Sequence, residues 1–202
     1  VLRLDADEWF MPEALEELKE KLPALPPDVT GVIHKRRHIF LGRWMKHGVY
    51  PVKLLRLFRY GAARCEQRHM DEHMELSRGR AVEFEHDFVD ENLNGLGWWA
   101  HKHVDYSARE LADLEDILSS AAADSGINGQ AERKRAMKER YARQPLFWRS
   151  FAYFCYRYFL KLGFLDGREG FLWHFMQGWW YRTLVDARQF EKQKKGSGKT
   201  AR

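Results

Sequence analysis

The sequence predicts an α/β fold that is followed by amphipathic C-terminal helices. In the first half of the 202 residues, apolar strand-like runs alternate with one helical segment. In the last third, basic and aromatic residues recur at helical spacing. The chain also opens at Val1 inside an apolar run. We therefore expect these residues to form the second part of a domain whose first part precedes Val1.

A helix is predicted over residues 12–22. Pro12 suits the first turn of a helix, where a backbone N–H has no partner in any case. Leu15, Leu18 and Leu22 then fall on one face, as an amphipathic helix requires. Three closely spaced prolines follow and are expected to end the helix.

The next segments are predicted to be strands. Residues 29–41 form one long run, and residues 49–60 alternate in part between apolar and charged side chains before stopping at Gly61. Short strands around a polar centre are predicted over residues 62–86.

The rear of the chain is predicted to be helical. A helical pattern over residues 92–118 is interrupted near 103–106, and a small, polar linker follows at 121–130. The remaining predicted elements are a basic helix at 131–143, aromatic helices at 145–162 and 169–190, and a Lys/Gly/Ser tail from Lys192 that we expect to be disordered. The predicted parts are an α/β segment at 1–120, basic and aromatic amphipathic helices at 121–190 and a disordered basic tail at 191–202.

Charge is distributed unevenly along the chain. The net charge is +5, but residues 1–128 carry −6 and residues 129–202 carry +11. A basic, aromatic rear part suits an anionic membrane surface or a nucleic acid. Cys65 and Cys155 lack metal-ligand spacing, so we expect free thiols in a reducing compartment.

An aromatic segment at residues 146–165 has about the 20-residue length that a bilayer span needs. Its charges argue against a span, because Arg149, Arg157 and Lys161 would each cost roughly 2.5–3.5 kcal/mol at the bilayer centre. The three cations share one arc of about 120° on the helix, while Phe147, Phe151, Phe154 and Leu162 lie elsewhere. This pattern predicts a helix that lies in the membrane interface. The alternative is an aromatic helix packed on the protein's own core.

The strongest chemical motif is Asp5-Ala6-Asp7, with Glu8 adjacent. It follows the apolar run at 1–4, so both carboxylates would stand at the end of a strand. Mg²⁺ and Mn²⁺ prefer carboxylate and phosphate oxygens. The motif therefore predicts a divalent cation held between Asp5, Asp7 and a diphosphate.

Two further polar groups are candidates for chemistry. The run at 69–73, His-Met-Asp-Glu-His, could bind a metal, supply a general base from Asp71 or Glu72, or form a solvated strand face. His86 follows a strand-like stretch and has a structural role as its default interpretation. Lys102 lies among aromatic residues and could meet a phosphate.

The order and spacing of these groups resemble a known family. The resemblance covers about residues 1–190 and is carried by Leu4–Glu8, Leu55–Arg59, Asp71–Met74, Gly79, His86, Lys102, Tyr106-Ser107, Gly163–Gly167 and Gly170-Phe171. Together they resemble the C-terminal half of bacterial family 2 glycosyltransferases of the GT-A (Rossmann-like) fold. The branch that builds lipopolysaccharide core and exopolysaccharide is the most similar.

The resemblance implies specific roles. Asp5 and Asp7 match the metal- and diphosphate-binding residues, and Glu72 matches the catalytic base, with Asp71 beside it. His86 and Lys102 match positions near the acceptor or the diphosphate. This branch usually has His-Glu where the chain has Asp71-Glu72, so which of the two carboxylates is the base stays open.

The resemblance also implies the partners and the location. These are a nucleotide-sugar donor, Mg²⁺ or Mn²⁺, and a lipid-linked or saccharide acceptor in cell-envelope polysaccharide synthesis, with inversion at the transferred sugar. We expect a peripheral enzyme on an anionic membrane surface, at the cytoplasmic face of the bacterial inner membrane, with no nucleic acid. We also expect this fragment to be inactive without the nucleotide-binding part.

Two other functions fit parts of the sequence. The basic, aromatic rear part is compatible with a non-enzymatic module that binds a membrane or nucleic acid. The cluster at 69–73 is compatible with metal-dependent hydrolysis.

Overall fold

The computed structural model describes residues 1–66, 73–120 and 130–199. These residues divide into two compact units. The first unit contains 1–66, 73–94 and 157–173, and the second contains 95–120, 130–156 and 174–199. The predicted boundary at residue 120 differs from this division, because the helix before it belongs to the second unit and the segment 157–173 belongs to the first.

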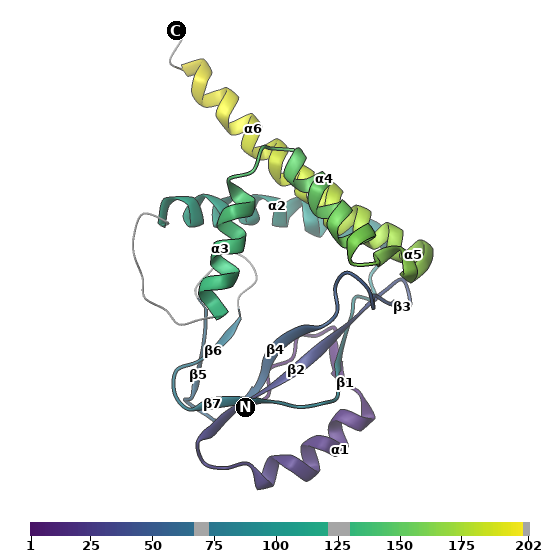
Figure 1. Cartoon of the computed structure of the whole chain (residues 1–202), viewed down its shortest axis with the longest axis vertical. Coiled ribbons are helices and arrows are strands. Elements are labelled where there is room, and N and C mark those ends of the chain that lie inside the picture. The colour runs from purple at the N-terminus through teal and green to yellow at the C-terminus, as the bar shows by residue number, and fades with distance from the viewer. Residues whose placement is uncertain (67–72, 121–129, 200–202) are drawn as a thin grey trace. The chain divides into compact units, whose positions relative to one another are not determined.

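The first unit is built on a mixed β-sheet (Figure 1). Its strands are β1 (Glu8–Phe10), β2 (Val29–Phe40), β3 (Arg43–Trp44), β4 (Val52–Phe58), β7 (Arg80–Glu83) and β8 (Phe88–Glu91). A separate antiparallel pair is formed by β5 (Ala63–Cys65) and β6 (Met74–Leu76). These strands and the accompanying helices confirm the α/β class.

The long strand β2 is the centre of this sheet. On one edge it pairs in parallel with β7 and then β8, and on the other edge it pairs antiparallel with β4 and β3. β1 extends the first edge by pairing antiparallel with β8. Residues 1–3 extend the other edge, where Leu2 forms a single antiparallel bridge with Leu57 of β4. The predicted opening strand is thus an extended run beside β4.

Helix α1 (Pro12–Lys21) covers part of the sheet and confirms the helix predicted there. Its apolar residues pack against side chains of β1, β4 and β8. The cluster is Phe10, Ala14, Leu54 and Phe88, with Leu4, Leu18 and Val52 packed against it. Leu4 therefore fixes the start of the Asp-x-Asp segment to this core. A 3-10 turn, η1 (Leu22–Ala24), follows the helix at the prolines.

The second unit is helical. It contains α2 (Leu96–Ser120), α3 (Gln130–Ala142), α4 (Trp148–Cys155), the π-helical turn η4 (His174–Trp180) and α6 (Tyr181–Lys199). Its core is Leu114, Ala142, Tyr181 and Val185, with Tyr106, Leu111, Leu118 and Trp180 against it. The basic helix predicted at 131–143 is confirmed as α3.

Two helix predictions differ from the structure. α2 continues through the expected break at 103–106, because the polar side chains there bond back to the helix: His103 Nδ1 lies 2.9 Å from the Trp99 carbonyl, and Ser107 Oγ donates to the Val104 carbonyl. α6 continues to Lys199 instead of becoming disordered from Lys192. Lys192 itself pairs with Glu115 of α2 at 2.7 Å.

The two predicted aromatic helices are confirmed. The first is α4, which continues directly into a π-helical turn, η2 (Tyr156–Leu160). A 3-10 turn, η3 (Gly163–Asp166), separates it from the second, which begins with α5 (Gly167–Trp173) and continues through η4 and α6. Among the described residues, no helix has both the length and the apolar character needed to cross a membrane. Both cysteines are free, as predicted.

Candidate functional site

The two predicted metal ligands lie in a turn across one face of the sheet. Residues 1–3 run along the β4 edge and β1 begins at Glu8 on the opposite edge, so Asp5 and Asp7 lie between the edges. The backbone N–H of Glu8 donates to the Asp5 carbonyl at 3.0 Å, and the N–H of Glu91 donates to the Asp7 carbonyl at 2.9 Å. The Asp5 side chain is 58% exposed. Backbone bonds thus hold the turn while the Asp5 carboxylate stays accessible.

A buried ion pair between Glu8 and Arg56 holds this turn to the sheet. Glu8 Oε1 accepts a short hydrogen bond from Arg56 Nη2, and Glu8 Oε2 accepts one from the backbone N–H of Asp5 at 3.1 Å. Arg56 also lies 3.6 Å from the Asp5 carboxylate and over the ring of Phe88. Burial raises the pKa of Glu8, although the Asp5 N–H and Arg56 act in the opposite direction. Glu8 therefore ties the Asp-x-Asp backbone to the sheet.

Three further charged residues extend this network, and sequence analysis missed them. Asp90 on β8 faces His38 and Arg36 on β2, with its Oδ2 3.4 Å from His38 Nδ1 and 3.2 Å from Arg36 Nη1. Burial would raise the pKa of Asp90, but its contact with the His38 side chain and the positive charges of Arg36 and Arg56 hold it below the ordinary value. The basic run in the middle of a predicted strand was the available signal, since such residues in a buried strand need a partner.

The side chains of the turn could bind a divalent cation only if a bound ligand supplied the remaining oxygen atoms around it. Asp5 and Asp7 offer oxygen donors, which Mg²⁺ and Mn²⁺ prefer. Glu8 is already used by Arg56 and by the Asp5 N–H. In the described parts of the chain, no three His, Cys, Asp or Glu side chains gather as a metal site. Two carboxylates with vacant positions suit a cation that is completed by phosphate oxygens.

His86 lies at the other end of β8 from this turn. It lies two residues before β8 begins at Phe88, whereas the Asp7 carbonyl is bonded to Glu91, the last residue of β8. His86 Nδ1 and its backbone N–H both lie 2.9 Å from a carboxylate oxygen of Glu17 on α1. Its visible role is to anchor α1, which was the default interpretation from sequence.

Glu17 is consequently an unusual carboxylate. Burial alone would raise its pKa, but the Glu85 backbone N–H, the Lys21 ammonium and His86 outweigh burial and lower the pKa to about 2. No sequence pattern around Glu17 indicates this role, because the groups that bind it come from residues 85 and 86.

Lys102 lies on α2 in the second unit. Its Nζ is 4.8 Å from the ring centre of Trp98 and 5.4 Å from that of Tyr106, one helical turn on either side. The structure therefore groups Lys102 with aromatic rings of its own helix. Asp71 and Glu72, the predicted catalytic carboxylates, lie outside the described residues, as do His69 and Met70.

The cationic arc predicted for the aromatic segment is turned inward instead of outward. Arg149 and Arg157 are both buried. Arg149 pairs with Asp186 at 2.7 Å, and Arg157 Nε donates to the Gly48 carbonyl at 3.1 Å. The prediction that these cations form the polar face of an interfacial helix is therefore wrong at these two positions, because each arginine found a partner inside its own unit.

Among known proteins, no family model matches the chain and no solved structure matches it. The side chains themselves thus carry the chemical interpretation, and the strongest arrangement is an exposed acidic turn braced by a buried Glu8–Arg56 pair.

Proposed function

We propose that this chain is the acceptor-side part of a metal-dependent, inverting glycosyltransferase of family 2 with a GT-A catalytic domain. The observation that carries the proposal is the Asp5–Asp7 turn: an exposed Asp5 and a half-buried Asp7 on a backbone held by hydrogen bonds and braced by Glu8 and Arg56. Such bracing ties the backbone of the turn to the buried side of the sheet. It suits a turn that must keep its geometry when a charged ligand arrives.

In the proposed reaction, Asp5 and Asp7 hold the cation and orient the donor diphosphate. A bound Mg²⁺ or Mn²⁺ supplies Lewis-acid neutralisation of the diphosphate charge. Glu72, or Asp71 beside it, takes the proton from the acceptor hydroxyl. The acceptor oxygen then bonds to the anomeric carbon as the bond to the diphosphate oxygen breaks. The nucleoside diphosphate leaves, and attack from the opposite face inverts the anomeric centre.

The remaining predicted residues keep supporting roles in this proposal. His86 fixes α1 through Glu17, and by family resemblance it lies toward the acceptor. Lys102 is assigned to the diphosphate by the same resemblance. The acceptor is a lipid-linked or growing saccharide, and the enzyme works at the cytoplasmic face of the bacterial inner membrane.

The decisive experiment measures donor binding by the complete enzyme, which under this proposal includes a nucleotide-binding half before Val1. Calorimetry with Mn²⁺ and a panel of nucleotide-sugars is compared for the parent, Asp5→Asn and Asp7→Asn. We expect binding to weaken at least about tenfold in both variants, since each loses a charged ligand to the cation. Asp28→Asn is the matched control, because Asp28 is also exposed but pairs with Arg80.

A second measurement separates binding from chemistry. Glu72→Gln should keep Mn²⁺-dependent donor binding and lose transfer, whereas the control Glu75→Gln should keep both. Equal donor binding by the parent and both aspartate variants would overturn the proposal. Salt-sensitive RNA binding without any donor binding would favour the non-enzymatic alternative instead.

A further inference from the structure

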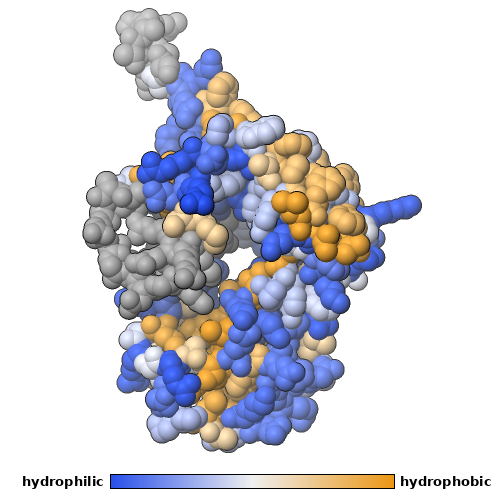
Figure 2. Space-filling view, in the orientation of Figure 1, coloured by the Kyte–Doolittle hydropathy of each residue, from blue (hydrophilic) through white to orange (hydrophobic). Residues whose placement is uncertain are grey.

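The turns that link η2 to α5 present large apolar side chains to solvent. Figure 2 shows hydrophobic residues gathered over the chain around α5. The exposed residues, which we name the apolar tip, are Phe159, Leu160, Leu162, Phe164, Leu165 and Phe171. Leu160 alone keeps 75% of its surface exposed. Contiguous exposed apolar surface of this kind marks an interaction site.

The exposure of the tip is fixed by the polar groups and glycines beneath it. Buried Asp166 accepts hydrogen bonds from the backbone N–H of His47 at 2.8 Å and from its Nδ1 at 2.6 Å. Gly170 lies so close to Gly163 that an added Cβ would stand 2.7 Å from the Gly163 carbonyl oxygen. Gly167 has a φ of 72°, which disfavours other residues. The backbone is thus anchored, and the apolar side chains project outward from a defined platform.

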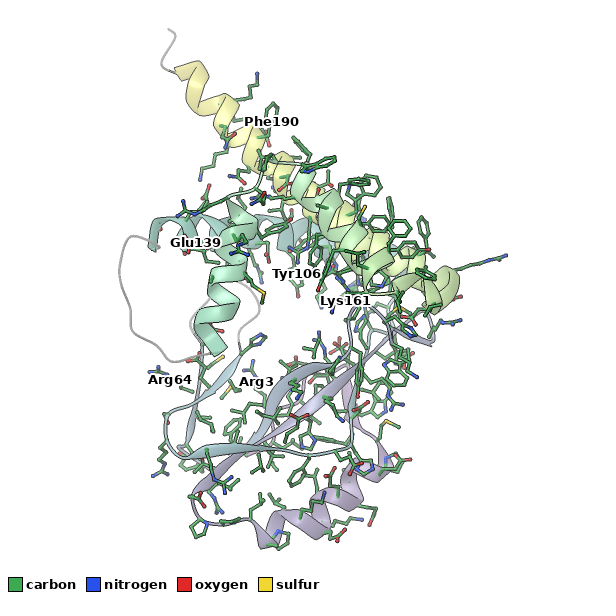
Figure 3. All side chains as sticks on the ribbon, viewed as in Figure 1. Arg3, Arg64, Tyr106, Glu139, Lys161 and Phe190 are labelled. Atoms are coloured by element: carbon green, nitrogen blue, oxygen red, sulfur yellow. The ribbon has the colours of Figure 1, made fainter. Side chains whose placement is uncertain are left out.

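Basic side chains surround the tip. Lys161, labelled in Figure 3, and Arg168 are exposed within the same segment, and Arg43 and Lys46 are exposed on the neighbouring β3 and the loop after it. Arg43 contacts the segment directly, through the Leu165 carbonyl at 3.5 Å. Within the segment 157–173 the acidic residues are the buried Asp166 and the partly exposed Glu169. The accessible charge around the tip is therefore positive.

We propose that the apolar tip inserts into the headgroup region of an anionic lipid bilayer. Apolar side chains would enter the acyl boundary while the surrounding cations meet lipid phosphates. A second copy of the chain fits less well, because two such surfaces would bring like charges together. The inferred membrane contact depends only on the residues of the apolar tip. Its purpose, which is to bring the active site to a lipid-linked acceptor, rests on the proposed function.

The test is co-sedimentation of the 202-residue chain with vesicles of phosphatidylcholine alone or of phosphatidylcholine with about 30% anionic phosphatidylglycerol, which attracts basic side chains. We expect binding to the anionic vesicles that weakens with salt. The variant Leu160→Ser/Phe164→Ser should lower the partition coefficient at least about tenfold on anionic vesicles. Lys161→Glu/Arg168→Glu should lower binding to anionic vesicles and change binding to neutral vesicles little.

Matched controls use residues of the same types away from the tip. Leu93→Ser replaces a leucine that is 85% exposed elsewhere in the first unit, and Arg78→Glu reverses an exposed charge in the turn before β7. Both should bind vesicles like the parent. Circular dichroism and thermal unfolding verify that each variant is folded. Hydrogen exchange should slow at residues 159–171 when anionic vesicles are added, and not at residues 80–94.

The outcomes separate this inference from the proposed function. Vesicle binding that survives both tip variants overturns the inference, as does a lipid-free dimer that Leu160→Ser/Phe164→Ser dissociates. Binding that polynucleotide abolishes while the tip variants leave it unchanged also overturns it. Tip-dependent vesicle binding by an enzyme that transfers no sugar to a water-soluble acceptor supports the membrane contact and refutes the proposed function. Sugar transfer to the water-soluble acceptor by an enzyme that does not bind vesicles supports the proposed function and refutes the membrane contact.

Discussion

Two buried arginine–carboxylate pairs, one in each unit, differ in how fully their hydrogen-bonding groups are used. In the second unit, Arg149 donates to Asp186, to the Ala142 carbonyl and to Gln189, all at 2.7–2.8 Å. Asp186 also accepts from the backbone N–H of Phe147 at 2.7 Å. Every nitrogen of this arginine has a partner. Such a pair holds three helical segments together and leaves nothing for a ligand.

The pair in the first unit is less complete. Arg56 bonds to Glu8 and lies near Asp5, but among the described residues its buried Nε has no hydrogen-bond partner. Burial raises the pKa of Glu8, so the site holds a charge that its surroundings disfavour. A pair whose hydrogen-bonding groups all have partners, here called saturated, is explained by its contribution to stability. An unsaturated pair, in which a buried group lacks a partner, lies here beneath an exposed acidic turn and points to a role in function.

The largest expected effect is at the saturated pair. Asp186→Asn should lower the free energy of unfolding by about 3–5 kcal/mol, because Arg149 would remain buried with its charge uncompensated. Urea unfolding followed by circular dichroism measures this loss. Glu115→Gln, at an exposed pair with Lys192, should change stability by less than about 0.5 kcal/mol. Equal losses in the two variants would show that saturation does not matter.

Glu17, a buried carboxylate that accepts hydrogen bonds mainly from N–H groups, should make the free energy of unfolding depend on pH. The pKa of Glu17 is about 2 in the folded chain against 4.5 as the ordinary value. Its stabilising contribution, about 2–3 kcal/mol, is therefore complete above pH 4.5 and lost as the pH falls toward 2. Urea unfolding from pH 6 to pH 3 should show a smaller decline in Glu17→Gln than in the parent.

Glu16→Gln is the control for this experiment, since Glu16 is on the same helix but exposed. Its pH profile should match the parent profile. A parallel decline in the parent and in Glu17→Gln would contradict the lowered pKa.

The unsaturated pair should contribute less to stability. Glu8→Gln is expected to cost about 1 kcal/mol, because burial already disfavours the charged form of Glu8 and Arg56 keeps the Asp5 carboxylate nearby. The same urea experiment provides the value. A loss as large as that of Asp186→Asn would remove the distinction between the two pairs.

The smallest expected effect is at Lys102. Lys102→Met should lower stability by about 0.5–1 kcal/mol, the usual size of an accessible cation–π contact. The proposed diphosphate role adds a second expectation, weaker donor binding by the complete enzyme. Lys138→Met, which breaks a pair with Asp113 in the same unit, is the control for donor binding. Unchanged donor binding in Lys102→Met would leave this lysine only its structural role.

Local signals located several elements to within a few residues. Pro12 and the leucines behind it placed α1, and the basic run placed α3. The run at 29–41 placed β2, although the turn at Leu41 and Gly42 and strand β3 were not foreseen. The expected break in α2 was wrong because side-chain bonds to the helix backbone are not visible as a pattern.

The candidate site was found only in part. Asp5 and Asp7 were recognised because they are neighbours in sequence, and Glu8 was noted beside them. Arg56 stood in a motif without an assigned role. Asp90 and His38 were missed because strand pairing, which joins residues about fifty positions apart, brings them together.

By itself, the sequence determined the Asp-x-Asp motif, the α/β class and the uneven distribution of charge, since these depend on neighbouring residues and on composition. Only the tertiary structure decided which charges face water. It turned Arg149 and Arg157 inward, where buried partners compensate them, and left Phe164 and Leu165 outside. A helical pattern shows which residues share a face. The direction of that face depends on partners supplied by distant segments, because a buried charge is tolerated only where such a partner lies within reach.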